Sequence, residues 1–312
     1  MLHLRVICPA ELTDEVLSRL GDQAGTAHLT VQRGVAVAPV GDLVQADIAR
    51  EAADDVLAQL CELGVDHSGG ITLEPLDTVL SDAADAAQVA APGDEADAVV
   101  WDELISRTGT ESRLSATFFA FLTLACLIAV VGVVTDSPVT IVGAMVVGPE
   151  FGPLAAVAVG LVLRRWDLVR RAGLALGLGF PAAIGVTAVA TLFAEAAGLV
   201  SVNPLGGADQ VDFIFDVGPF SFIVALLAGA AGMLSITSAR SAALVGVFIS
   251  VTTVPAAAAA VVAVTTGDVA RSLQSSAQLL VNLLGIVLAG AVVLALRTRR
   301  RGGAMGRPLA RG

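Results

Sequence analysis

The chain has 312 residues, of which 55% are hydrophobic and 15% charged, and its formal net charge at pH 7 is −11. Ordinary soluble domains carry roughly 25% charged residues, so this composition excludes a water-soluble fold for most of the chain and predicts an integral membrane protein. Of the 29 acidic residues, 21 precede residue 114, so the negative charge belongs to the N-terminal part. An acidic surface repels nucleic acid, which is therefore not an expected partner.

Three cysteines (Cys8, Cys61 and Cys126) are scattered and odd in number. This pattern predicts neither a disulfide framework nor a metal site, and it favours a reducing compartment for the N-terminal part. The first 30 residues lack the basic start, apolar stretch and cleavage site of a signal peptide. We therefore expect the N-terminal domain to stay in the cytoplasm.

Residues 1–78 alternate between hydrophobic periods of two and of 3.6, which indicates a compact α+β unit. The pattern predicts strands at 2–8, 27–31 with a continuation to 37, 43–48 and 70–76, and helices at 12–20 and 50–63. The resulting order is βαββαβ, the ferredoxin-like plan. By analogy of fold alone, such a domain senses a ligand, contacts other subunits or serves only as an attachment.

Residues 79–98 are alanine-rich and acidic without an apolar period, which predicts a solvated linker. The rest of the linker region, up to residue 113, contains Trp101, and tryptophan prefers the headgroup layer of a membrane. A short interfacial helix is therefore expected at 99–106.

From Leu114 onward, long apolar stretches alternate with short polar breaks, and each is long enough to cross a hydrocarbon core of about 30 Å. They predict an α-helical membrane domain over residues 114–296 with about six spans, followed by a basic cytoplasmic tail at 297–312. The spans are placed at 114–134, 138–163, 172–197, 217–238, 241–265 and 273–296.

The arginines predict the orientation of these spans, since cytoplasmic loops carry an excess of basic residues. With the N-terminus inside, only Arg271 among the loop arginines lies outside. The inner group consists of Arg113, Arg164, Arg165, Arg170, Arg171, Arg240, Arg297, Arg299, Arg300 and Arg301. We therefore expect a bacterial inner-membrane protein with both termini in the cytoplasm.

The membrane domain contains an internal repeat, in which the sequence from Ser137 aligns with that from Ser241. The offset is nearly constant: 103 from Gly143 to Gly246, 102 from Pro153 to Pro255 and 101 from Asp167 to Asp268. Three spans per unit would insert the second copy upside down, as in many secondary transporters. The competing interpretation is that small apolar residues align in any membrane protein.

Spans two and five hold polar residues and helix breakers at matching places, which predicts an intramembrane site between the repeats. Prolines and glycines there free backbone carbonyls at membrane depth, and such carbonyls must face protein, water or an ion. The alternative is helix packing, with hydroxyls and amides as interhelical hydrogen-bond partners. The candidate residues are Gly143, Gly148, Pro149, Glu150, Gly152, Pro153, Thr252, Thr253, Pro255 and Asn282.

Glu150 is the most informative of these residues. A carboxylate halfway along a span costs several kcal/mol unless it is neutralised, paired or hydrated, and no arginine lies mid-span to pair with it. It is therefore expected to hold a proton or exchange it for a cation, which is the chemistry of a coupled carrier. The competing interpretation is a shifted span in which Glu150 reaches an aqueous surface.

Catalytic motifs are not found. All three histidines lie in the N-terminal domain, so the membrane part has neither a metalloprotease motif nor a Ser/His pair. No phosphate-binding loop or dinucleotide fingerprint occurs. We expect a protein that is not an enzyme and that needs no cofactor.

The runs SATFFAFLTLACLIAVVGVVTDSPVTIVGAMVVGPEFGPL, GAAGMLSITSARSAALVGVFISVTTVP and LLVNLLGIVLAG resemble the bacterial and archaeal membrane family known as domain of unknown function 389. In that family the first motif usually reads GAM, two aliphatic residues, then APLMGP. Here Gly148 replaces the alanine, and Glu150 and Phe151 replace Leu and Met. The second motif usually ends in two prolines, whereas this chain has Pro255 followed by Ala256. The resemblance implies the membrane architecture and no established activity.

These observations predict a transporter or channel for a small solute or ion, embedded in the lipid bilayer, with its site between the repeats. The alternative is a non-transporting membrane sensor or anchor whose N-terminal domain binds a ligand or partner. The sequence also allows a homo-oligomer. A water-accessible cavity that reaches Glu150 would favour transport, whereas a dry bundle beneath a domain with a ligand pocket would favour the alternative.

Overall fold

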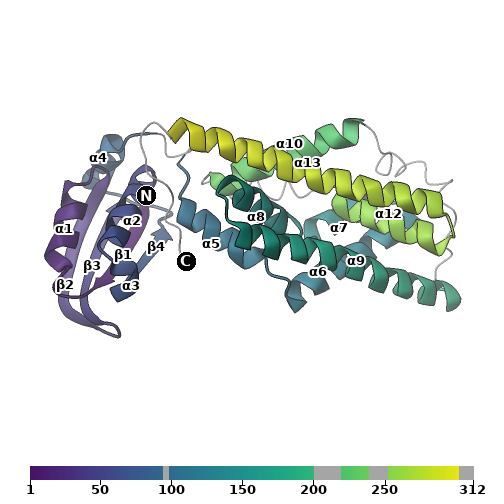
Figure 1. Ribbon diagram of the computed structural model, residues 1–312, viewed down its shortest axis with the longest axis horizontal. Helices are drawn as coiled ribbons and strands as arrows, with labels where there is room; N and C mark the ends of the chain where they lie inside the picture. The colour runs from purple at the N-terminus through teal and green to yellow at the C-terminus, as the bar shows by residue number, and fades with distance from the viewer. Residues whose placement is uncertain (94–97, 200–218, 239–251, 302–312) are drawn as a thin grey trace. The chain divides into compact units, whose positions relative to one another are not determined.

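The computed structural model describes residues 1–93, 98–199, 219–238 and 252–301 (Figure 1). These residues form two compact units. The N-terminal unit is built mainly from Met1–Leu104, and the helical unit from Ile105–Ile236 with most of the described residues that follow.

The N-terminal unit is a four-stranded antiparallel sheet with helices, as the sequence predicted. The strand order across the sheet is β2-β3-β1-β4. Residue Leu2 of β1 lies opposite Ile48 of β3 on one side and opposite Pro75 of β4 on the other. The main elements are β1 (Leu2–Cys8), α1 (Thr13–Asp22), β2 (Thr26–Val37), β3 (Val40–Ile48), α2 (Ala53–Glu62) and β4 (Gly70–Pro75), with the short η1 (Arg50–Ala52) and α3 (Val65–Ser68) between them.

Alternating side chains of β1 form the core of this unit. Leu4 and Val6 are fully buried and pack with Val16 and Leu20 of α1 and with Leu60 of α2. Figure 1 shows α1 and α2 on the same side of the sheet. This arrangement follows from period-two burial in the strand and period-3.6 burial in the helices.

The segment predicted as a solvated linker differs from that expectation, because it contains the helix α4 (Asp82–Ala90). Ser81 caps this helix by accepting a hydrogen bond from the Ala84 N–H at 3.4 Å. Ala84 and Ala87 are buried where α4 packs against β2 and β3. Alanine methyl groups are enough to form a buried stripe, although their weak apolar signal gives no clear period. The helix expected around Trp101 is present as α5 (Trp101–Glu111).

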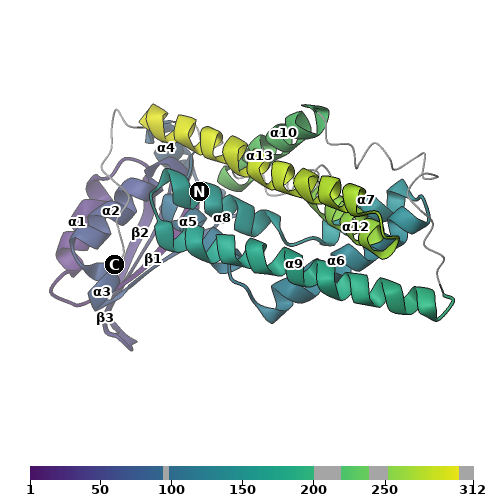
Figure 2. The ribbon, with the colours of Figure 1, turned by 45° about the vertical axis from the view of Figure 1, so that its right-hand side comes forward.

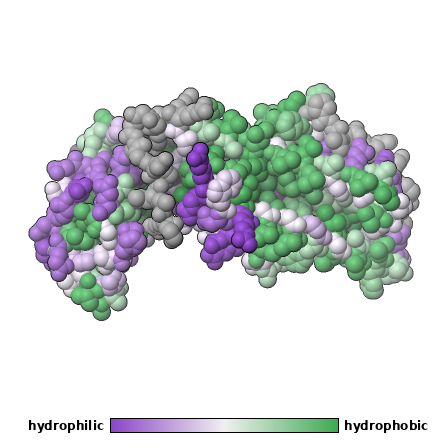
Figure 3. All heavy atoms as spheres, in the orientation of Figure 1, coloured by the Kyte–Doolittle hydropathy of each residue, from purple (hydrophilic) through white to green (hydrophobic). Residues whose placement is uncertain are grey.

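The helical unit supplies apolar helices at the predicted span positions. They are α6 (Ala116–Val134), α7 (Pro138–Val147), α8 (Phe151–Val162), α9 (Trp166–Ala196), α10 (Pro219–Thr237), α12 (Thr253–Thr265) and α13 (Val269–Arg301). Apolar residues cover much of the face of these helices that is visible in Figure 3. Exposed leucines and valines at this density are typical of a surface that contacts lipid.

Four of the described helices (α6, α9, α10 and α13) are long and apolar enough to cross a membrane. The pair α7 and α8 counts as a fifth span if its two halves, bent by 53°, form one broken helix. The structure therefore agrees with a membrane protein of four to five described spans. The fifth predicted span, at 241–265, lies partly outside the described residues, and its described half is the shorter helix α12.

Helix α12 lies at the centre of the helical unit, and its residues from Thr253 to Ala263 are almost completely buried. It packs against α13, α6, α9 and α7. The two views of Figures 1 and 2 both place α12 beside α13. Small side chains allow this close approach, since five of the α12 residues in a row are alanines, Ala256 to Ala260.

Candidate intramembrane site

The break between α7 and α8 positions the candidate site. Pro149 has no N–H and disfavours a helical conformation at the preceding residue, so α7 ends before it, and Gly148 is extended with ψ of 129°. Glu150 then returns to helical dihedral angles and accepts the first hydrogen bond of α8, from the Leu154 N–H at 3.2 Å. Pro153 is tolerated at the third position of α8, where no N–H is required.

Glu150 is buried at this break, with 2% of its surface exposed. Its Oε1 accepts a hydrogen bond from the hydroxyl group of Thr253, at 2.6 Å, on the first turn of α12. Its Oε2 has no hydrogen-bond partner among the described residues and lies directly against Gly148. Because an isolated ionised carboxylate is very costly in a low-dielectric interior, this oxygen attracts a proton, a cation or a water molecule.

A second set of polar contacts joins the start of α12 to α13. Asn282 donates from Nδ2 to the hydroxyl oxygen of Thr252 at 2.7 Å and to the carbonyl oxygen of Thr252 at 3.4 Å. Gln278, one turn earlier on α13, donates from Nε2 to Oδ1 of Asn282 at 3.2 Å. Asn282 and Gln278 are both fully buried. The peptide bond between Thr252 and Thr253 connects these contacts to Glu150.

The structure brings together most of the residues predicted for the site. Glu150 contacts Thr253, Thr252 contacts Asn282, and Gly148 and Pro149 form the break beside them. The remaining residues have other neighbours: Gly152 packs against Glu111, Pro255 lies buried within α12, and Gly143 has open space where a side chain would start.

Sequence reasoning missed Gln278. The signal was present, since Gln278 and Asn282 are spaced by one helical turn within an otherwise apolar helix and therefore share a face. An amide pair on one face of a span favours interhelical hydrogen bonds.

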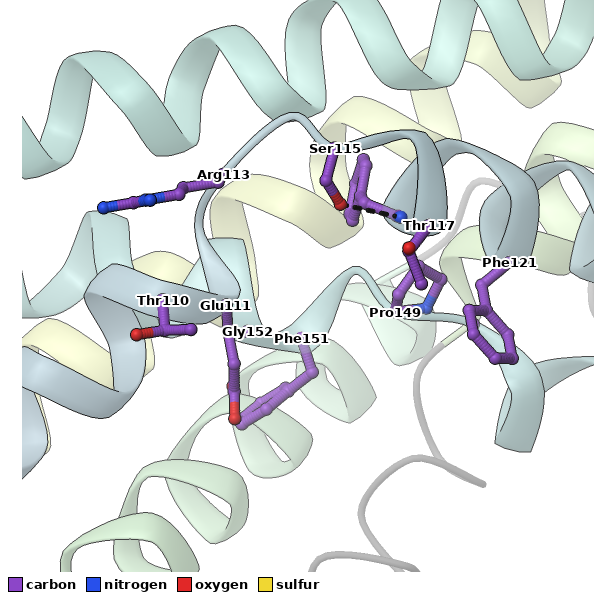
Figure 4. Close-up of a pocket in the computed structure, with 11 residues that line it drawn as sticks. Thr110, Glu111, Arg113, Ser115, Thr117, Phe121, Pro149, Phe151 and Gly152 are labelled. Carbon is purple, nitrogen blue, oxygen red and sulfur yellow. Dashed lines mark hydrogen bonds between the residues drawn. The ribbon is translucent and has the colours of Figure 1, made fainter.

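A pocket of about 320 Å³ lies beside the α7–α8 break. It is lined by the end of α5, the start of α6 and the residues on both sides of Glu150. Figure 4 shows Glu111 beside Gly152 and Phe151, with Pro149 close to Phe121. Glu150 does not line the pocket, because its side chain is directed to α12 instead. Oε2 of Glu150 lies against Gly148, which is one of the residues that line this pocket.

The N-terminal unit holds a separate polar cluster around Asp47. The imidazole Nδ1 atoms of His3 and His28 lie 2.7 Å from its two oxygens, and Nε2 of His28 lies 2.8 Å from the Ser81 hydroxyl group. Burial raises the pKa of the Asp47 carboxyl, but the hydrogen bonds with His28 and His3 outweigh it and hold the pKa below its usual range. The cluster attaches the start of α4 to the sheet.

Comparison with known proteins relates the helical unit to one family. Residues 145–288, from the end of α7 into α13, match the family described as Domain of unknown function (DUF389). This part of the chain is therefore similar to the DUF389 family. The match includes the α7–α8 break and every residue of the hydrogen-bonded network from Glu150 to Gln278.

A curated relative supports this assignment. An uncharacterised protein of Methanocaldococcus jannaschii is 23% identical over 208 residues, which is 64% of this chain. The aligned part covers 60% of the length of that relative. No solved structure matches the chain. Neither the family description nor the relative names an activity.

Proposed function

We propose that this protein is a transporter or channel for a small solute or ion, and that Glu150 is the group that couples movement to a proton or a cation. The observation that carries the proposal is a buried carboxyl group at a helix break, with one oxygen hydrogen-bonded to Thr253 and the other without a partner in the described residues. Ionisable residues inside membranes are costly and usually mark ion pathways or proton relays.

Two helix starts that meet at Glu150 support a site between inverted repeats. Helix α8 begins at Phe151 and α12 at Thr253, an offset of 102 that matches the sequence repeat, and both have proline at the third position. The positive ends of two helix dipoles therefore lie near Glu150. Discontinuous helices at the repeat interface are the usual substrate sites of secondary transporters. The proposal includes six spans, arranged as two repeats of three.

The arrangement resembles an occluded state. Glu150 is buried, and the 320 Å³ pocket ends at the neighbouring residues Gly148 and Pro149. In the proposed cycle, a shift at the break exposes Glu150 to this pocket and lets it exchange its proton or cation. The two glycines that flank the break, Gly148 and Gly152, would permit such a change at small cost.

The remaining features of the proposal concern orientation and the N-terminal unit. The arginine distribution supports an inner-membrane protein with both termini cytoplasmic. The proposal includes no enzymatic activity. The sheet order β2-β3-β1-β4 is that of a ferredoxin-like domain and supports this assignment. Contact with a second copy would use β2, which lies at the sheet edge and exposes Val35 and Val37.

The alternative function is a membrane sensor whose N-terminal domain binds a ligand. The cluster of His3, His28 and Asp47 favours it, because these groups lie together on the sheet and His28 is partly exposed. Under this alternative, Glu150 has only a packing role.

An experiment on vesicles separates the two functions. The full chain is reconstituted into liposomes that contain a pH-sensitive dye, and an inward Na⁺ or K⁺ gradient is imposed. Transport predicts a change of internal pH that is absent from empty liposomes and from liposomes with Glu150→Gln. Equal traces for the parent, the variant and empty liposomes would contradict the proposal and favour the sensor.

A further inference from the structure

The network that starts at Glu150 continues across α12 to Gln278, and both of its ends are unsatisfied oxygens. Oε2 of Glu150 and Oε1 of Gln278 are buried and have no hydrogen-bond partner within the part of the chain that the structure describes. Buried polar atoms in folded proteins nearly always have a partner, so two such atoms at the ends of one network suggest a missing ligand.

Hydrogen-bond chemistry fixes which atom of each amide is unpaired. The carbonyl oxygen of Thr252 can only accept, so the atom of Asn282 that faces it must be the donor Nδ2. Oδ1 of Asn282 therefore faces Gln278, which must present its own donor Nε2. In this arrangement Oε1 of Gln278 is the amide atom without a partner among the described residues.

The same reasoning gives the charge of the ligand. The Thr253 hydroxyl group and the amides of Asn282 and Gln278 already donate inside the network. The two atoms without a partner among the described residues are both oxygens, and Glu150 carries the formal charge of the network. An ionised Glu150 would repel an anion, whereas a cation finds an oxygen at each position.

The network has one formal negative charge, at Glu150, and this charge determines the valence of the cation that it can neutralise. A divalent ion would leave an uncompensated charge in a low-dielectric interior, whereas a monovalent ion is neutralised. Carboxylate and amide oxygens are ligands for hard cations such as the alkali metals and not for soft transition metals.

We propose that Gln278 and Asn282 extend the Glu150 site into a track for a small monovalent metal cation, with a charged position at Glu150 and a neutral one at Gln278. This inference rests on the proposed function and adds the ligand class to it. A proton can occupy the position at Glu150 but not that at Gln278, because an amide does not take up a proton near neutral pH. Gln278 therefore distinguishes a metal cation from a proton.

The test measures binding to the purified full chain in detergent. Thermal unfolding is followed in NaCl, LiCl or KCl at fixed ionic strength, with N-methyl-D-glucamine chloride as the replacement salt. The parent should be stabilised by at least one alkali cation in a saturable way. Gln278→Leu should weaken the apparent affinity at least tenfold, in the range seen when groups around a metal ligand are removed.

Two further variants keep the test decisive. Gln278→Glu retains the shape and adds a charge, so it should bind the cation more tightly even if Gln278→Leu folds poorly. Thr187→Val removes a buried hydroxyl group of α9 that also has no partner and lies outside the network, so it should bind like the parent.

Two results would overturn the inference without touching the proposed function. The first is a parent that responds to no alkali cation although it moves protons in vesicles, and the second is a Gln278→Leu variant that binds like the parent. A parent that binds the cation through both residues but moves nothing across vesicles would instead overturn transport and leave the binding site in place.

Discussion

Arg164 and Gly267, which are 103 residues apart, occupy the same position in two helix-to-helix turns. Their φ angles are 56° and 78°, and in each turn the following residue donates its N–H to a carbonyl group five residues earlier at 2.8 Å. This is the hydrogen-bond pattern of a helix that ends in a left-handed residue. The turn between α6 and α7 has the same geometry, so the turn type is general in this protein. The turn type alone therefore does not indicate a repeat. The spacing of 103 residues between Arg164 and Gly267 does support one, because it agrees with the offset found in the sequence.

The repeat predicts that Asp167 and Asp268, just after these turns, lie on opposite sides of the membrane. In a chain whose native cysteines are replaced by serine or alanine, Asp268→Cys should react with an impermeant thiol reagent in intact cells. Asp167→Cys should react only after the membrane is permeabilised. The two sites are matched, since both aspartates are exposed at the start of a helix. Labelling of both positions from the same side would show that the repeats are not inverted.

Gly148 and Glu150 should be energetically coupled, because a Cβ atom at residue 148 would collide with Oε2 of Glu150. We expect Gly148→Ala to destabilise the parent by about 1–3 kcal/mol, the usual cost of overpacking. In a Glu150→Leu background, Gly148→Ala should destabilise the protein much less. Alanine at position 148 and leucine at position 150 are the residues that the family motif usually combines. The four proteins of this double-mutant cycle are compared by thermal unfolding. Equal costs in both backgrounds would show that the contact has no energetic consequence.

The N-terminal unit should be more stable as residues 1–104 than as residues 1–78. Val100 belongs to its hydrophobic core and Leu104 is buried, and full burial of each such side chain contributes about 1.5–3 kcal/mol. Both fragments are expected to fold, and urea unfolding followed by circular dichroism should give the longer one the higher midpoint. Identical midpoints would mean that α4 and the residues after it add no stability.

Asp47→Asn should remove a pH-dependent part of the stability of the 1–104 fragment. The pKa of Asp47 is lowered in the folded state, so its contribution is present above the ordinary pKa of aspartate, about 3.9, and is lost as the pH falls through the folded pKa. At pH 7 the variant should be less stable by about 1–2 kcal/mol. Between pH 4 and pH 2 the stabilities of variant and parent should converge. A difference that stays constant over this range would exclude an ionised Asp47 as its source.

The sequence predicted the elements whose signal is local. Strong apolar periods located the strands of the N-terminal unit and the helices of the membrane domain, and Gly148, Pro149 and Pro153 marked a break that the structure contains. Glu150 stood out because a carboxylate is rare inside a span. Each of these signals comes from chemistry within a few residues of the chain.

Features that depend on distant partners were not predictable. The α4 helix is held by contacts with β2 and by Ser81, which interacts with His28 at a distance of 53 residues in sequence. Gln278 gains its meaning only from Asn282, one turn later on α13, and from Thr252 at the start of α12. The contact between Glu150 and Thr253 spans 103 residues, and the repeat suggested their proximity but not the hydrogen bond.

The central claim is that Glu150 takes part in coupled movement across the membrane, and the pH dependence of flux in liposomes tests it most directly. Initial cation-driven changes of internal pH are measured between pH 5 and pH 9 for the parent and for Glu150→Gln, which keeps the shape and the hydrogen bond to Thr253 but cannot titrate. We expect the parent to show flux that depends on pH, and the variant to insert and assemble normally but to show no such flux. A variant whose flux matches that of the parent at every pH would contradict the account.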